Sequence, residues 1–180
     1  TSLIRKKLIN LIKEKNEILK SLSKDYRNNF NSKNLKKFKK SLDYRVIGMG
    51  GSSLGAQAIY DFLRHKIKKR FFFINDLKRK NHEKKNKNHN NLIISKSGNT
   101  IETIVNVNLL IKKQDQNILI TENKKNYLNI LAEKLKADII HHNDYIGGRY
   151  SVLSEVGMLP AELMGLKINN SKQLNFLIKN

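Results

Sequence analysis

The strongest chemical signal in the sequence is a run of polar residues between an apolar segment and a helical pattern. Residues 92–94 predict a buried strand, and Asn99 and Glu102 stand at the N-cap and N3 spacing of a capping box, so we expect the run to open a helix. It brings together hydroxyls, one ammonium group and backbone N–H groups, in Ser95, Lys96, Ser97, Gly98, Asn99 and Thr100. Because a helix N-terminus carries partial positive charge and unpaired donors, this turn predicts a phosphate site, with a capped turn that binds nothing as the alternative.

This run resembles the phosphate-binding loop of sugar isomerase (SIS) domains, which has the pattern SxSGxTxE. The pattern is filled in order by Ser95, Ser97, Gly98, Thr100 and Glu102. In glucose-6-phosphate isomerases the loop has the form SKxxxTxET, which Lys96 and Thr103 also match. The resemblance implies that the phosphate of a sugar substrate is held by Ser95, Lys96, Ser97 and Thr100.

A second turn suited to a ligand follows a strand predicted over residues 45–50. It reads GMGGSSLG, and its glycines allow the backbone to turn sharply and to approach a ligand closely. It is similar to the GxGGSxLG turn of glucose-6-phosphate isomerases, filled by Gly48, Gly50, Gly51, Ser52, Leu54 and Gly55. That resemblance implies that Gly51 and Ser52 contact the substrate, whereas a plain helix N-cap at Ser52 or Ser53 is the alternative.

The same glycines leave a dinucleotide-binding interpretation open. That fingerprint has the spacing G-x-G-x-x-G, and Gly48 and Gly50 fit it, but Ser53 stands at the position of the third glycine. Asp76 stands where an acid that binds a ribose is expected. This interpretation accounts for fewer residues of the turn than the isomerase pattern does.

A third stretch, residues 147–160, reads GGRYSVLSEVGMLP and closely resembles the GGRYS signature of glucose-6-phosphate isomerases. This signature separates that family from other SIS domains. Arg149 is the candidate catalytic residue, because a guanidinium is permanently charged and its planar fork of donors suits negative charge that develops on substrate oxygens. The alternative for Arg149 is a structural ion pair with a nearby acid.

The elements that position these turns alternate between strands and helices. Further strands are predicted over residues 71–75, 117–121 and 137–141, and helices over residues 54–63, 101–111 and 127–135. The pattern predicts an α/β fold with a parallel sheet of about five strands and helices on both faces, SIS-like and flavodoxin-like, preceded by an N-terminal helical segment. We expect boundaries at residues 1–43, 44–166 and 167–180. In such a fold the ligand-binding turns gather at the carboxyl ends of the strands.

Other segments give weaker predictions. Residues 1–24 have the spacing of one amphipathic helix, and residues 78–91 carry too few apolar side chains to dock a helix on the sheet. Ser154 is expected to cap a helix in which Pro160 is an interruption, since proline kinks or ends a helix. A last short amphipathic helix is predicted over residues 171–177.

Composition limits the class of protein. The 180 residues include no cysteine, and the net charge is +21. The lysines are spread through every segment rather than gathered in a patch, so we do not expect nucleic-acid binding to be the function and expect an anionic sugar phosphate as partner. The five histidines lack metal-ligand spacing, and we expect no metal and no cofactor. With no apolar run long enough for a membrane span and no signal peptide, we expect a cytoplasmic protein.

Together these features predict the N-terminal part of a glucose-6-phosphate isomerase, active in glycolysis and gluconeogenesis. The family is described as using a glutamate, a histidine and a lysine in segments that follow GGRYS, and no matching segment is present. Glu102 is expected to cap a helix, Glu155 and Glu162 to lie on a helix surface, and His141 and His142 are weak site candidates. We therefore expect a fragment that lacks the catalytic base and that forms a homodimer at full length. The alternative is a SIS module that binds a phosphosugar without catalysis, as in some transcriptional regulators.

Overall fold

The apolar runs predicted as strands pair into one parallel sheet. The computed structural model describes residues 2–14, 17–21, 26–77 and 88–168. Its strands are β1 (Asp43–Ile47), β2 (Arg70–Ile74), β3 (Asn90–Ile94), β4 (Gln116–Glu122) and β5 (Asp138–His142). The order across the sheet is β2-β1-β3-β4-β5, and every neighbouring pair is parallel. The predicted class of fold is therefore confirmed.

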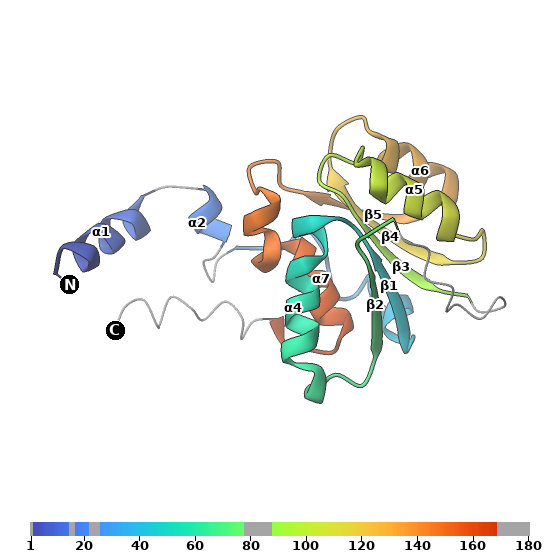
Figure 1. Cartoon of the computed structure of the whole chain (residues 1–180), viewed down its shortest axis with the longest axis horizontal. Helices are drawn as coiled ribbons and strands as arrows, with labels where there is room; N and C mark the ends of the chain where they lie inside the picture. The colour runs from blue at the N-terminus through green and yellow to red at the C-terminus, as the bar shows by residue number, and fades with distance from the viewer. Residues whose placement is uncertain (1, 15–16, 22–25, 78–87, 169–180) are drawn as a thin grey trace.

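Helices cover both faces of this sheet, as predicted (Figure 1). The helices that the structure describes are α1 (Ser2–Lys13), α2 (Glu17–Ser21), α3 (Lys36–Lys39), α4 (Leu54–Phe62), α5 (Ile101–Leu110), α6 (Tyr127–Leu135) and α7 (Glu155–Leu163). The 3-10 turns are η1 (Gly50–Ser52), η2 (Arg64–Lys66) and η3 (Gly148–Leu153). Helices α4 and α7 lie on one face of the sheet, and α5 and α6 lie on the other.

Alternate residues along each strand point to opposite faces of the sheet, so each face has its own hydrophobic core. Val46, Leu92 and Ile120 pack against Leu159 of α7, in the cluster that also takes in Phe38 of α3. The intervening residues of the same strands, such as Ile47, Ile93 and Leu119, pack beneath α5 and α6. Successive strand residues point to opposite faces, so continuous apolar runs are what a sheet covered on both sides requires.

Buried polar groups cross the sheet toward the amino ends of its central strands. Arg45 donates through Nε to Asn91 Oδ1 at 2.7 Å, and its guanidinium pairs with Asp115 Oδ2 at 2.9 Å, with both side chains 0% exposed. Asn91 Nδ2 donates in turn to Asn117 Oδ1 at 2.7 Å. Since Arg45, Asn91 and Asn117 are in register on three neighbouring strands, the chain satisfies this polar row internally. Strand β3 accordingly begins at Asn90, earlier than the apolar run indicated.

The N-terminal region departs from the prediction of one helix over residues 1–24. Helix α1 ends at Lys13 and α2 begins at Glu17, because residues 14–16 (Glu-Lys-Asn) offer no apolar side chain to continue the pattern. Leu3 and Ile4 of α1 are exposed, and α1 lies apart from the sheet (Figure 1). None of the helices that the structure describes is long and apolar enough to cross a membrane.

Helix α7 packs against α4 on the same face of the sheet, and nearly all of it is buried. Ser154 caps it as predicted, since its side chain accepts from Val156 N. Pro160 does not end the helix, which continues to Leu163. The helix predicted over residues 171–177 and most of the polar stretch 78–91 lie outside the described residues.

Candidate phosphosugar site

Three turns gather at the carboxyl edge of the sheet, where the alternation of strands and helices predicted them. Residues 48–53 follow β1, residues 95–100 follow β3, and residues 143–153 follow β5. Strands β1 and β3 are neighbours, and a side-chain carbon on Gly48 would lie 2.7 Å from the carbonyl oxygen of Ile94. The first two turns are therefore in direct contact at their base.

The turn after β3 is held by its own hydroxyl groups. Ser95 is buried, and its Oγ lies 2.9 Å from Thr100 Oγ1. Ser97 is exposed, and its Oγ accepts from the backbone N–H of Asn99 at 3.2 Å. Gly98 N donates to Ser95 O at 3.1 Å, which closes the turn. Ser95 thus supports the turn from beneath, while the hydroxyl of Ser97 lies on its outer side.

Gly98 seats this turn on the start of α6. Its φ is +67°, and a Cβ there would lie 2.2 Å from the side chain of Asn126, which itself caps α6 by accepting from Asn129 N. Gly98 O also accepts from Leu128 N at 3.2 Å. Both the left-handed backbone and the close contact exclude a larger side chain at this position.

The predicted capping box of Asn99 and Glu102 is wrong. The N-cap of α5 is Thr100, and no side chain caps it. Asn99 Oδ1 instead accepts from Tyr127 N at 2.9 Å, because the neighbouring helix α6 competes for the same side chain. The first N–H groups of α5 are therefore not used by a side-chain cap, which suits the binding of an anion.

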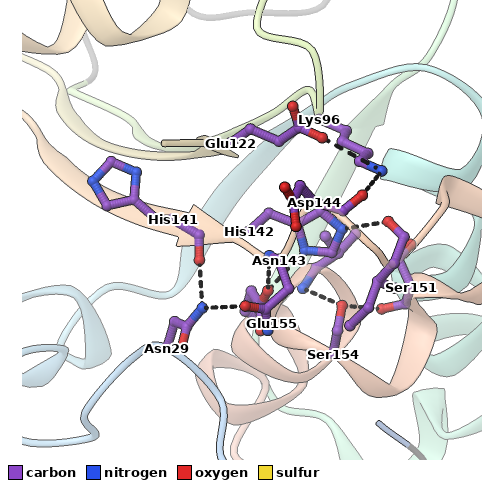
Figure 2. Close-up of polar contacts among 12 residues, drawn as sticks. Asn29, Lys96, Glu122, His141, His142, Asn143, Asp144, Ser151, Ser154 and Glu155 are labelled. Carbon is purple, nitrogen blue, oxygen red and sulfur yellow. Dashed lines mark hydrogen bonds and ion pairs between the residues drawn. The ribbon is translucent and has the colours of Figure 1, made fainter. Parts of the chain in front are cut away.

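Lys96 joins the turn after β3 to the turn after β5. Its Nζ donates to the backbone oxygen of Asp144 and lies 3.4 Å from Glu122 Oε1 (Figure 2). Glu122, the last residue of β4, also pairs with Lys124 at 3.2 Å. The ammonium group is consequently fixed above the carboxyl ends of β3, β4 and β5 rather than extended into solvent.

Glycine allows the turn after β1 to pack against the GGRYS segment. A Cβ at Gly51 would lie 2.3 Å from Gly148 O, and Ser151 Oγ donates to Gly51 O at 3.3 Å. Gly55 similarly leaves space for Val152, whose side chain would lie 2.9 Å from an added Cβ. The close approach that Gly51 and Gly55 permit is thus used by the chain itself. Ser52 lies in η1 beside this contact and is half-buried.

Arg149, the predicted catalytic residue, lies in η3 and is exposed. Among residues 2–14, 17–21, 26–77 and 88–168 Arg149 forms no ion pair or hydrogen bond. The alternative interpretation, a structural ion pair with a nearby acid, therefore finds no support in these residues. No cluster of acids and histidines in the same ranges suits a metal ion. The guanidinium is therefore available for a ligand at the edge where the three turns meet.

Beneath the GGRYS segment lies a buried polar network that the sequence did not reveal. His142 Nδ1 is 2.7 Å from Glu155 Oε1, and the two side chains are 1% and 0% exposed. Glu155 Oε2 accepts from Tyr26 OH at 3.0 Å, and Oε1 accepts from Asn143 N at 3.2 Å. The prediction that Glu155 lies on a helix surface is wrong, because two other segments, one with Tyr26 and one with His142 and Asn143, supply it with partners. Figure 2 shows this network next to Lys96 and Asp144.

The network decides the charge of Glu155. Burial raises the pKa of this carboxyl group, but hydrogen bonds from His142, the backbone and Tyr26, with the charge of His142, bring the pKa below its ordinary value of 4.5. Burial raises the pKa of Tyr26, and the negative charge of the Glu155 carboxylate raises it further. Glu155 is thus an ionised structural group and not a base poised for proton transfer.

Glu162 also departs from its predicted surface position. Its side chain is 11% exposed and pairs with Lys39 Nζ at 2.6 Å. The pair lines a pocket of about 490 Å³ together with Lys69 and Lys167. This pocket lies where β1 and β2 begin, at the opposite end of the strands from the three turns.

Comparisons with known proteins place this arrangement in a family. The family model described as phosphoglucose isomerase matches residues 5–174. The glucose-6-phosphate isomerase of Mycoplasmoides gallisepticum is 36% identical over 143 residues, covering 70% of this chain and 34% of that protein. The glucose-6-phosphate isomerase of Methanocaldococcus jannaschii is 36% identical over 150 residues, covering 76% of this chain and 37% of that protein. The chain spans about a third of the length of these curated relatives.

Solved structures show the same fold. A hypothetical protein from Thermus thermophilus superposes with a TM-score of 0.67 at 21% identity, over 92% of this chain and 44% of that one. The Vibrio vulnificus NanR protein, solved with ManNAc-6P, superposes with a TM-score of 0.50 at 17% identity, over 83% of this chain and 57% of that one. The fold, the three turns and the family match agree, and this chain belongs to the phosphoglucose isomerase family.

Proposed function

We propose that this chain forms the phosphosugar-binding part of a glucose-6-phosphate isomerase, which interconverts glucose 6-phosphate and fructose 6-phosphate. The observation that carries the proposal is the contact among the three turns. Lys96 reaches the turn after β5, and Gly51 packs against Gly148, so the phosphate-binding pattern and GGRYS belong to one site. Two relatives that are 36% identical to this chain over 143 and 150 aligned residues carry that activity in their names.

Each residue of the site has a role in the proposal. The phosphate binds at the start of α5, where the hydroxyls of Ser97 and Thr100 and the ammonium group of Lys96 can meet its oxygens. Ser95 orients Thr100 from below. The sugar carbons then extend toward the two turns that pack together, where Gly51 and Ser52 contact the substrate.

The reaction moves a proton between neighbouring carbons. A base takes the proton from C2 of the open-chain aldose, and the resulting enediol receives it at C1, while the hydroxyl proton moves from the oxygen on C2 to the oxygen on C1. Negative charge develops on these two oxygens as the first proton leaves. Arg149 stabilises that charge with its permanently protonated guanidinium.

The proposal places the base outside residues 1–180. Glu155 is held by His142 and Tyr26, and Glu102 lies in the first turn of α5, at the phosphate end of the substrate. The purified chain should consequently bind fructose 6-phosphate but convert it hardly at all. Rapid conversion to glucose 6-phosphate, followed with a coupled dehydrogenase, would show that this part of the proposal is wrong.

Binding can be tested by calorimetry with fructose 6-phosphate. Ser97→Ala and Thr100→Ala should each weaken binding by about 1–3 kcal/mol, because each removes a hydrogen bond to a charged oxygen. Ser2→Ala, at an exposed serine of α1 outside the three turns, is the matched control and should bind as the wild type does. Equal affinity in all three variants would place the phosphate elsewhere.

A phosphosugar-binding module without catalysis is the second candidate, supported by the shared fold of a protein solved with ManNAc-6P. The GGRYS segment favours the isomerase. A full-length protein that binds fructose 6-phosphate without converting it, and that binds duplex DNA in a salt-dependent way, would favour the module. The homodimer and the cytoplasmic location stay predictions from the resemblance.

A further inference from the structure

The buried pair of His142 and Glu155 brackets the GGRYS segment. His142 is the last residue of β5, Glu155 is the first of α7, and the segment between them carries Arg149. Their side chains meet at 2.7 Å with almost no exposure. A loop of this length has many conformations when only its backbone ends are fixed, so a side-chain contact at its base restricts it strongly.

Both ring nitrogens of His142 are within hydrogen-bond distance of a partner. Nε2 lies 3.0 Å from the carbonyl oxygen of Ile146, which can only accept. Nδ1 faces the Glu155 carboxylate, which already accepts from Tyr26 OH and Asn143 N. His142 thus ties Glu155 to the first part of the loop through contacts of both its ring nitrogens.

A second set of bonds fixes the same base from the N-terminal side. Tyr26 OH donates to Glu155 and accepts from Asn143 Nδ2 at 2.8 Å. Asn29 Nδ2 donates to the carbonyl oxygen of His141 at 2.8 Å. Residues far apart in the sequence thus converge on one carboxylate, and we call His142, Glu155 and Tyr26 the clamp.

The far side of the loop is in contact with the proposed phosphosugar site. Asp144 O accepts from Lys96 Nζ (Figure 2), and Ser151 Oγ donates to Gly51 O. Ser154 Oγ donates to Ser151 O at 2.7 Å and continues the connection to the start of α7. These bonds between the clamp and the site therefore run through the segment that carries Arg149.

We propose that the clamp is a positioning device, which fixes the GGRYS segment against the phosphate-binding turn and thereby sets the place of Arg149. Glu155 does not touch the substrate in this role. A buried ion pair is a poor source of stability compared with apolar packing, but it defines one arrangement sharply because each charge needs its partner. The effect of the clamp on substrate binding rests on the proposed function, whereas its effect on the order of the GGRYS segment does not.

The test compares Glu155→Gln with Asp115→Asn in the 180-residue chain. Both replace a fully buried carboxylate of an ion pair by its amide, but Asp115 pairs with Arg45 away from the three turns. Hydrogen exchange measures directly how well the backbone amides of the loop are protected. In Glu155→Gln the amides of residues 143–154 should exchange about tenfold faster or more relative to the amides of β4, whereas in Asp115→Asn any faster exchange should be shared equally by β4.

Ligand binding measures whether the clamp also affects the proposed phosphosugar site. The probes are inorganic phosphate, which needs only the turn after β3, and arabinonate 5-phosphate, whose carboxylate stands in for the enediolate oxygens. In Glu155→Gln the affinity for arabinonate 5-phosphate should fall by about tenfold or more, while that for inorganic phosphate stays within about twofold. Asp115→Asn should leave both affinities within about twofold. A general loss of stability would not separate the two probes.

Two results would overturn the clamp. One is unchanged exchange of residues 143–154 relative to β4 in Glu155→Gln, and the other is an equal effect of Asp115→Asn on that segment relative to β4. If Glu155→Gln does not fold, Tyr26→Phe removes one bond of the clamp and should still speed exchange of the same segment, so protection equal to the wild type overturns the proposal. A wild-type chain that binds neither probe counts against the proposed function alone, since exchange still decides the clamp.

Discussion

The two ends of the sheet each bury an ion pair, and the pairs differ in what they connect. Toward the amino ends of the central strands, Arg45 and Asp115 satisfy a polar row within the sheet core. At the carboxyl edge, His142 and Glu155 join a strand, a loop and a helix beneath the candidate site. The same kind of interaction therefore completes the core at one end and orders a ligand-binding loop at the other. Burial alone does not distinguish these roles, whereas the partners of each pair do.

Breaking the amino-end pair should have the largest effect on stability. Asp115→Asn should lower the free energy of unfolding by about 3–5 kcal/mol, because it leaves the Arg45 charge buried without its partner. Urea unfolding measures this loss. A loss below about 1 kcal/mol in Asp115→Asn would mean that water reaches the pair.

A change at Gly98, at the carboxyl edge of the sheet, should affect both stability and ligand binding. Gly98→Ala should cost about 1–3 kcal/mol of stability, since alanine strains a backbone with φ of +67° and meets Asn126. It should also abolish detectable binding of fructose 6-phosphate at millimolar concentration. Gly147→Ala is a matched control for the lost flexibility, because an added Cβ there meets only Tyr150 at 3.7 Å. Wild-type binding by Gly98→Ala would contradict the account of this turn.

The carboxyl-edge pair should give the protein a distinct response to acid. Because the pKa of Glu155 is below 4.5 in the folded state, its contribution to stability is present above that pH and is lost as the pH falls through the folded value. Between pH 6 and about pH 3, the wild type should lose more of its free energy of unfolding than Glu155→Gln does. Urea titrations at a series of pH values measure the difference. Parallel curves for the two proteins would show that Glu155 is not held ionised.

An exposed pair should show the smallest effect. Lys37 and Asp138 meet at 2.7 Å, but their side chains are 56% and 47% exposed. Lys37→Ala should change the free energy of unfolding by about 0–1 kcal/mol, since solvent screens such a pair. A loss as large as that of Asp115→Asn would break the comparison between buried and exposed pairs.

Local patterns in the sequence were sufficient for most of the fold. Apolar runs located the five strands to within a few residues, and alternation with helices indicated a parallel sheet covered on both sides. The cap at Ser154 was also predictable, because an N-cap acts on the next turn of the same helix. The order of the strands was not, since it depends on contacts between segments far apart in the chain.

The errors share one physical cause. Asn99 was expected to cap its own helix, but Tyr127 of another segment takes its side-chain oxygen. Glu155 and Glu162 have surface-like spacing, yet His142 and Lys39 from elsewhere in the chain hold them in less exposed places. A polar side chain whose partner is distant in sequence looks the same as a solvated one. The residues of the candidate site were found through a resemblance to a family, and the clamp beneath them was not.

The most direct test of the central claim is an NMR titration of the ¹⁵N-labelled chain with fructose 6-phosphate. We predict that the largest shifts fall on the amides of residues 95–102, 50–53 and 147–151, with a further change at the side-chain Nε of Arg149. The account would be contradicted by shifts confined to the pocket of Lys39, Lys69 and Lys167, or by no shifts at millimolar ligand.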